Sequence, residues 1–343
     1  MARPRYCPAT ILMTPPLDRP RAQCNGRPMS NAGFSGSRLS PFLVAIEEAR
    51  NSPLIVGARP AARWKRLAGF IALSFVLMIA ASIVIALAMI AIEAMGLVRA
   101  GVFDPVPEGP NRLYGEIVSV LGLGAFLGLL AGAVLLSAKI AYGAPTTAFL
   151  WPGRPFARRQ LWLGFIVMAV VGSASVLIYN LIDPTGPAPI VNPAYSIESR
   201  LFYVAAATLG LFAAAAAEEV VFRGVLLRVT GGFTGSLIIL CLFNAVVFSA
   251  IHLDPDPVAF VARALSGLIW TWAALRLGGI EFAIGAHWAG NLAIALLGEP
   301  LTTEAVSTEP TPLSALAYEA VALVVVLIVV ERIVRARRAQ PSA

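Results

Sequence analysis

The sequence has few charged residues for its length. Only 13% of its 343 residues are charged, whereas 58% are hydrophobic. A soluble globular domain carries about 25% charged and roughly 45–50% apolar residues. The composition therefore excludes a water-soluble enzyme and a disordered scaffold, and it indicates a polytopic helical membrane protein.

Cysteine and histidine are also scarce. The three cysteines show no C-x-x-C spacing, and Cys7 and Cys24 lie in a polar stretch, so we expect neither a disulfide framework nor a cysteine-rich metal site. The chain has only two histidines, His252 and His287. The net charge of +7 does not indicate a nucleic-acid partner, because membrane proteins concentrate cations in their cytoplasmic loops.

Long apolar segments dominate the remaining chain. Crossing a hydrocarbon layer of ~30 Å takes roughly 17–25 residues in a helix. Eight segments are candidates, the fifth and seventh being short: Leu67–Ile92, Ile117–Ala138, Leu161–Ile182, Leu201–Arg228, Leu237–His252, Val258–Leu277, Ile280–Leu297 and Leu313–Val330. Basic and acidic connections alternate, which indicates that both termini are cytoplasmic.

These observations predict an all-α, polytopic transmembrane helical bundle of about eight spans, with the bilayer as its surroundings. We expect the transmembrane domain at residues 61–333. The polar, Pro- and Arg-rich residues 1–60 are predicted to be a disordered cytoplasmic tail, and residues 334–343 a basic cytoplasmic tail.

The first polar cluster in the apolar phase follows a run of alanines. Glu218 and Glu219 are adjacent, and Arg223 comes four residues after Glu219. Residues at i and i+4 share a helix face, so Arg223 can pair with Glu219 and leave Glu218 free for proton chemistry. An ion pair at a helix end on the membrane surface is the alternative interpretation.

Two further clusters contain the two histidines. Phe248 and His252 are one helical turn apart, and so are His287 and Asn291. Each histidine alone is compatible with an exposed helix end or with hydrogen bonding between helices. Since ionisable groups inside a membrane are costly, three such clusters on neighbouring spans indicate one shared polar centre.

These residue types suit peptide hydrolysis. We predict that Glu218 is the general base and that His252 shares its water, while His287 and Asn291 donate to the oxyanion. Glu219, Arg223 and Phe248 would support them. A metal version remains open, in which Glu218, His252 and His287 hold a divalent ion such as Zn²⁺.

The three motifs, E-E-x-x-x-R from Glu218, F-x-x-x-H from Phe248 and H-x-x-x-N from His287, resemble those of the CPBP family of intramembrane proteases. This family includes the type II C-a-a-X prenyl endopeptidases and the bacteriocin-immunity (Abi) proteins. The resemblance covers residues 200–297 and implies a C-a-a-X protease-like core in the bacterial cytoplasmic membrane. It also implies a glutamate- or metal-dependent endopeptidase that cleaves a membrane-associated protein or peptide, with the same residues in the roles given above.

Two other functions remain open. A proton-coupled transporter would use the buried glutamate and histidines as a relay. A non-catalytic bacteriocin-immunity or scaffold protein would keep the fold without the chemistry. Arg263, inside the sixth segment, either orients a substrate carboxylate or pairs with an acidic loop residue.

Overall fold

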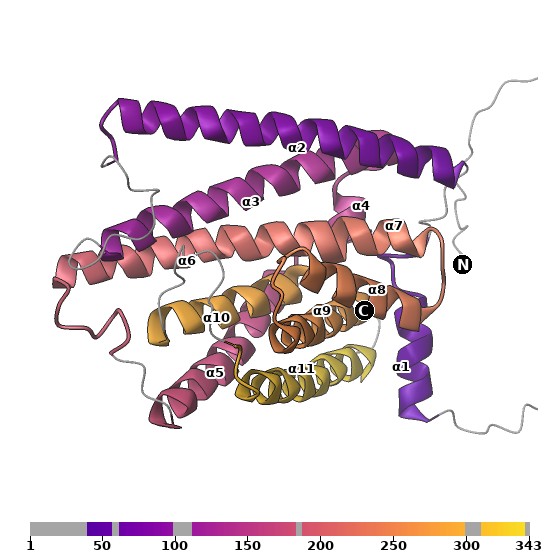
Figure 1. Ribbon diagram of the computed structural model, residues 1–343. Coiled ribbons are helices and arrows are strands. Elements are labelled where there is room, and N and C mark those ends of the chain that lie inside the picture. Colours follow the sequence, from indigo (N-terminus) through magenta and orange to yellow (C-terminus); the bar gives the residue numbers. More distant parts are fainter. Residues whose placement is uncertain (1–39, 57–61, 99–111, 183–186, 299–309, 340–343) are drawn as a thin grey trace, which may run out of the picture. The chain divides into compact units, whose positions relative to one another are not determined.

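The computed structural model describes residues 40–56, 62–98, 112–182, 187–298 and 310–339 (Figure 1). All regular structure in these ranges is helical, which confirms the predicted fold class. The helices are α1 (Pro41–Arg50), α2 (Arg63–Ala94), α3 (Arg112–Tyr142), α4 (Thr147–Leu150), α5 (Arg158–Ile182), α6 (Ile197–Glu219), a π-helix (Val220–Leu226), α7 (Leu227–Gly231), α8 (Leu237–Ala250), α9 (Pro257–Leu277), α10 (Glu281–Leu297) and α11 (Ser314–Ala339).

Each of the eight predicted apolar segments is a helix, and the chain is a multi-pass membrane protein. Six helices among the described residues are long and apolar enough to cross a membrane: α2, α3, α5, α6 continued through α7, α9 and α11. The other two are shorter, since α8 has 14 residues and α10 has 17. These are the fifth and seventh predicted segments.

Helix α10 lies against α5, α6 and α9, and most of its residues are buried (Figure 1). Helices α10 and α5 approach closely because each has a glycine, without a Cβ, where the two helices cross. A Cβ on Gly285 would lie 1.9 Å from the carbonyl oxygen of Leu161, and a Cβ on Gly164 would lie 2.1 Å from that of Phe282. Small residues allow membrane helices to approach in this way. The crossing fixes the position of α10, which carries one of the two histidines.

The π-helix Val220–Leu226 continues α6 directly after Glu219. Near its end, the backbone N–H of Leu227 bonds to the carbonyl of Phe222, five residues earlier. π-helical turns are rare and occur often at functional sites. The sequence predicts an ordinary α-helix in this stretch, so the wider turn is a finding of the structure.

The predicted N-terminal tail needs correction over residues 40–56. Ser40 caps helix α1, with its hydroxyl accepting from the N–H of Leu43, and Pro41 is the first helical residue. Ala49 and Leu54 are fully buried in the core, and α1 contacts α8 and α9. This capped start and its apolar face explain why the segment folds onto the bundle.

Helix α11 continues to Ala339 and buries Val334, so the predicted basic tail from residue 334 begins within this helix. Its place in the cytoplasm stays a prediction. Residues 1–39 and 57–61 lie outside the described residues. The prediction of a disordered tail therefore remains a prediction there.

Candidate active site

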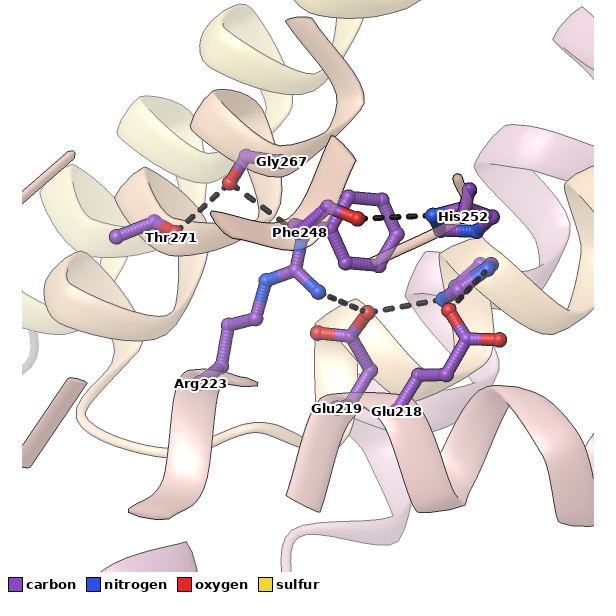
Figure 2. A network of polar contacts seen from close by, with 8 residues as sticks. Glu218, Glu219, Arg223, Phe248, His252, Gly267 and Thr271 are labelled. Atoms are coloured by element: carbon purple, nitrogen blue, oxygen red, sulfur yellow. Dashed lines mark hydrogen bonds and ion pairs between the residues drawn. The ribbon is translucent and has the colours of Figure 1, made fainter. Parts of the chain in front are cut away.

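The first group of the site is a buried ion pair next to the π-helix (Figure 2). Nη1 of Arg223 donates to Oε1 of Glu219 at 2.9 Å, and both side chains are inaccessible to solvent. Nη2 of Arg223 donates to the carbonyl of Gly267 on α9 at 3.4 Å. The guanidinium also lies over the ring of Phe248, 4.3 Å from its centroid, a cation–π contact. The predicted pairing of Arg223 with Glu219 is present.

His287 joins this pair from α10. Its Nδ1 lies 2.9 Å from Oε1 of Glu219, the oxygen that Arg223 also contacts. A carboxylate oxygen only accepts, so Nδ1 carries the proton and donates. Glu219 therefore fixes the orientation of the imidazole, and Nε2 is directed away from it.

Glu218 faces that second nitrogen. Its Oε2 lies 3.9 Å from Nε2 of His287, which is too long for a hydrogen bond. The same oxygen is buried and has no hydrogen-bond partner among the described residues. Both glutamates have a buried Oε2 without a partner among the described residues, but only Glu219 is held by a cation through its other oxygen, as the sequence suggested.

His252 lies in the turn that follows α8, not within the helix. Its Nδ1 is 2.8 Å from the carbonyl oxygen of Phe248, so this nitrogen donates and Nε2 has a free lone pair. The Phe248 ring centroid lies 5.2 Å from that of His252 and 5.9 Å from that of His287. Phe248 therefore contacts both imidazoles, and Figure 2 shows His252 and Glu218 on the same side of this ring, away from Arg223.

Asn291 follows His287 by one turn of α10 and is half-buried. The structure gives its side chain no hydrogen bond to another described residue. Its amide therefore remains available, as the prediction for an oxyanion donor requires.

A metal ion does not fit these side chains as they stand. Among the described residues, no three histidine, cysteine, aspartate or glutamate side chains are arranged to hold one. The 3.9 Å between Glu218 and His287 also exceeds the separation of two ligands that share a zinc ion at about 2.0–2.2 Å each in tetrahedral geometry. The set Glu218, His252 and His287 as metal ligands therefore stays a prediction.

Arg263 does not enter the site. Its Nη1 donates to Oδ2 of Asp254 at 2.8 Å in the connection between α8 and α9, which is the second of the two predicted roles. The N–H of Asp256 and the guanidinium of Arg263 hold the pKa of Asp254 below its ordinary value. Asp256 caps α9 by accepting from the N–H groups of Val258 and Ala259. This connection therefore anchors the turn that carries His252.

Glu319 on α11 is a half-buried acid that was not among the predicted site residues. Oγ of Ser266 on α9 donates to its Oε2 at 2.6 Å, and its charge interacts with that of His287. The signal was present, because Glu319 lies inside the predicted span Leu313–Val330, where an ionisable residue is a functional candidate by default.

Comparisons with known proteins agree with the location of these motifs. Residues 200–293 match the sequence model of the family described as type II CAAX prenyl endopeptidase Rce1-like, a family of proteases. The chain is also 27% identical over 174 residues to the uncharacterized protein YyaK of Bacillus subtilis (strain 168). That alignment covers 48% of this chain and 56% of YyaK, so the chain spans little more than half the length of this relative.

No solved structure matches the chain. The family match includes Glu218, His252, His287 and Asn291 within its limits. Residues 200–293 of the chain are thus similar to the type II CAAX prenyl endopeptidase Rce1-like family, and they lie within a multi-pass helical membrane protein.

Proposed function

We propose that this protein is an intramembrane endopeptidase that hydrolyses a peptide bond of a membrane-associated protein or peptide. One observation carries the proposal: a buried, unpaired oxygen of Glu218 faces Nε2 of His287 across 3.9 Å. A polar gap longer than 3.5 Å suits a bridging water molecule. A carboxylate beside such a water, with donors nearby, is the arrangement that general-base hydrolysis requires.

In the proposed reaction, Glu218 takes a proton from this water while the water oxygen attacks the scissile carbonyl carbon. The new oxyanion accepts hydrogen bonds from Nε2–H of His287 and the side-chain amide of Asn291. The C–N bond then breaks, and the proton held by Glu218 passes to the leaving amine. Nε2 of His252 accepts a hydrogen bond from the second O–H of the attacking water, which stays on the new carboxyl group.

The buried ion pair supports this chemistry without contacting the substrate. Glu219 holds Nδ1 of His287, so the ring can present a proton at Nε2. The carboxylate of Glu219 balances the positive charge on the imidazole in that state. Arg223 keeps Glu219 ionised and in place through their 2.9 Å contact. Removing either member therefore misplaces His287.

The family match supports a peptide substrate and the bilayer as the protein's partners. We further propose that the protein resides in a bacterial cytoplasmic membrane with both termini in the cytoplasm, because basic and acidic connections alternate along the chain. A divalent metal held by Glu218, His252 and His287 is the competing mechanism, and the experiment includes a test of it.

The test is peptide cleavage by purified protein in liposomes, read by mass spectrometry on a library of apolar peptides. We expect Glu218→Gln to lower the rate by about 10²–10⁴-fold, the usual contribution of a general base. Glu198→Gln is the matched control, since Glu198 lies exposed in the first turn of the same helix α6. Wild-type activity that persists with a chelator supports direct carboxylate catalysis, whereas its loss supports the metal mechanism.

The same preparation tests the two alternative functions. Proton-coupled flux in the liposomes, without cleavage of any peptide, would overturn the proposal in favour of a transporter. A cellular immunity phenotype that survives both Glu218→Ala and His252→Ala would favour the non-catalytic protein.

A further inference from the structure

A groove of about 750 Å³ lies between the C-terminal ends of α5 and α10 and the beginning of α11. Figure 1 shows these three helices on the side of the bundle away from α2. Apolar side chains such as Val176, Ile178, Ile294 and Val321 line it. Ile178 and Val321 are more than half exposed at 57% and 53%. Two of these helices, α5 and α11, are long and apolar enough to cross a membrane.

The groove also has polar groups spread along it. Ser175, Tyr179 and Asn180 contribute from α5, and Ser314 and Tyr318 from α11. None of the described residues that line it is charged. Nδ2 of Asn180 donates to the carbonyl of Leu297, which caps the end of α10 and leaves the amide oxygen of Asn180 free to accept.

This mixture fits a peptide better than a lipid tail. An acyl chain needs no hydrogen bonds, whereas an unwound peptide in the bilayer must satisfy every backbone N–H and C=O. A protease substrate must be extended at the scissile bond, because the carbonyl of a regular helix is covered by its own hydrogen bond. Hydroxyl and amide groups in an apolar groove supply the missing partners.

One lining residue of the groove, Tyr318, lies close to the turn of α10 that carries the candidate donors. The hydroxyl of Tyr318 lies 3.6 Å from the position that a Cβ on Gly290 would take. Gly290 precedes Asn291 on α10, within one turn of His287. The next residue of α11, Glu319, interacts by charge with His287. A chain in the groove would therefore arrive beside the proposed oxyanion donors.

We propose that this groove binds an extended, uncharged segment of the substrate chain next to the scissile bond, and that the substrate enters it sideways from the bilayer. This inference rests on the proposed protease function and names the binding site for its substrate.

The first test blocks the groove. Ala317→Trp places an indole in it, and Ala320→Trp makes the same change at an exposed residue of α11 outside the lining. The substrates are a peptide cleaved by the wild type and the same peptide extended by ten apolar residues. We expect Ala317→Trp to raise KM for the extended peptide at least tenfold, with kcat and the short peptide little changed. If Ala317→Trp and Ala320→Trp have the same KM for the extended peptide, the inference is overturned.

The second test uses a photo-crosslinker, p-benzoylphenylalanine, in place of Ala317 in the full chain, with the inactive Glu218→Gln background to retain substrate. Crosslinks to the extended peptide support the groove, and crosslinks to phospholipid alone overturn it. The two proposals fail separately. If the peptide crosslinks at position 317 but the wild type cleaves no peptide, the groove is supported and the protease function is overturned. If the wild type cleaves the extended peptide and Ala317→Trp does not change its KM, the protease function is supported and the groove is overturned.

Discussion

Replacing Gly285 by alanine tests whether the crossing of α5 and α10 sets the geometry of the site. An alanine Cβ would lie 1.9 Å from the carbonyl oxygen of Leu161, whereas real contacts of this kind are essentially never shorter than 3.0 Å. The obstacle is backbone, so the two helices must separate by about 1.1 Å, the difference between these distances. Overpacking of this kind costs about 1–3 kcal/mol of stability.

The displacement acts on His287, which lies two residues after Gly285 on α10. Its 2.9 Å contact with Glu219 and its 3.9 Å approach to Glu218 both depend on the position of this helix. A misplacement of about 1 Å can cost roughly 10²-fold in rate. We therefore expect Gly285→Ala to reduce peptide cleavage about 100-fold, with a lower thermal unfolding midpoint.

The matched control is Gly132→Ala on α3. A Cβ there meets no atom within 4 Å, and alanine is the better helix former. This variant should keep the wild-type rate and unfold at the same or a higher temperature. Gly285→Ala protein that cleaves at the wild-type rate would refute the reasoning, because it would mean that α10 can move without disturbing the site.

Three further predictions concern the polar network and the connection beside it. Glu219→Gln leaves Arg223 buried without its counter-ion and should cost about 3–5 kcal/mol, measured by thermal or chemical unfolding in detergent. Phe248→Leu removes the ring 4.3 Å from the Arg223 guanidinium and should cost about 1–2 kcal/mol beyond the lost apolar area; an equal loss in an Arg223→Met background would argue against the cation–π contact. Because the pKa of Asp254 is lowered, its pairing with Arg263 should stabilise the protein above the ordinary value of 3.8 and lose that effect on acidification below it. The free energy of unfolding of Asp254→Asn should therefore change less with pH in this range than that of the wild type.

The helices of this protein are predictable from sequence because apolar runs of membrane length leave little choice of structure. The 14-residue α8 and the 17-residue α10 were correctly placed by hydrophobicity alone. Helix α1 was not predicted, because its short amphipathic pattern stands in a polar region. Its fold depends on contacts with α8 and α9 that are remote in sequence.

Contacts within one helix of the site were likewise predictable from the sequence, whereas those between helices were not. The pairing of Glu219 with Arg223 followed from their i, i+4 spacing, and the scarcity of histidine drew attention to His252 and His287. The distances between these four side chains could not be predicted from the sequence, because the side chains belong to three different helices and a turn. The approach of Glu319 to His287 likewise needs the fold, because 32 residue positions separate them in the sequence.

Because a π-helix follows Glu219, the number of residues in this stretch matters for the position of Arg223 as much as the side chains do. A π-helical turn accommodates one residue more than an α-helical turn between the same flanking segments. Deleting Val221 would let the stretch return to an ordinary α-helix, with α6 and α7 still seated on their neighbours. Arg223 would then stand three positions after its carboxylate instead of four, under a different part of the Phe248 ring. The helical bundle would then tolerate a shorter fourth span, whereas the proposed hydrolysis would not.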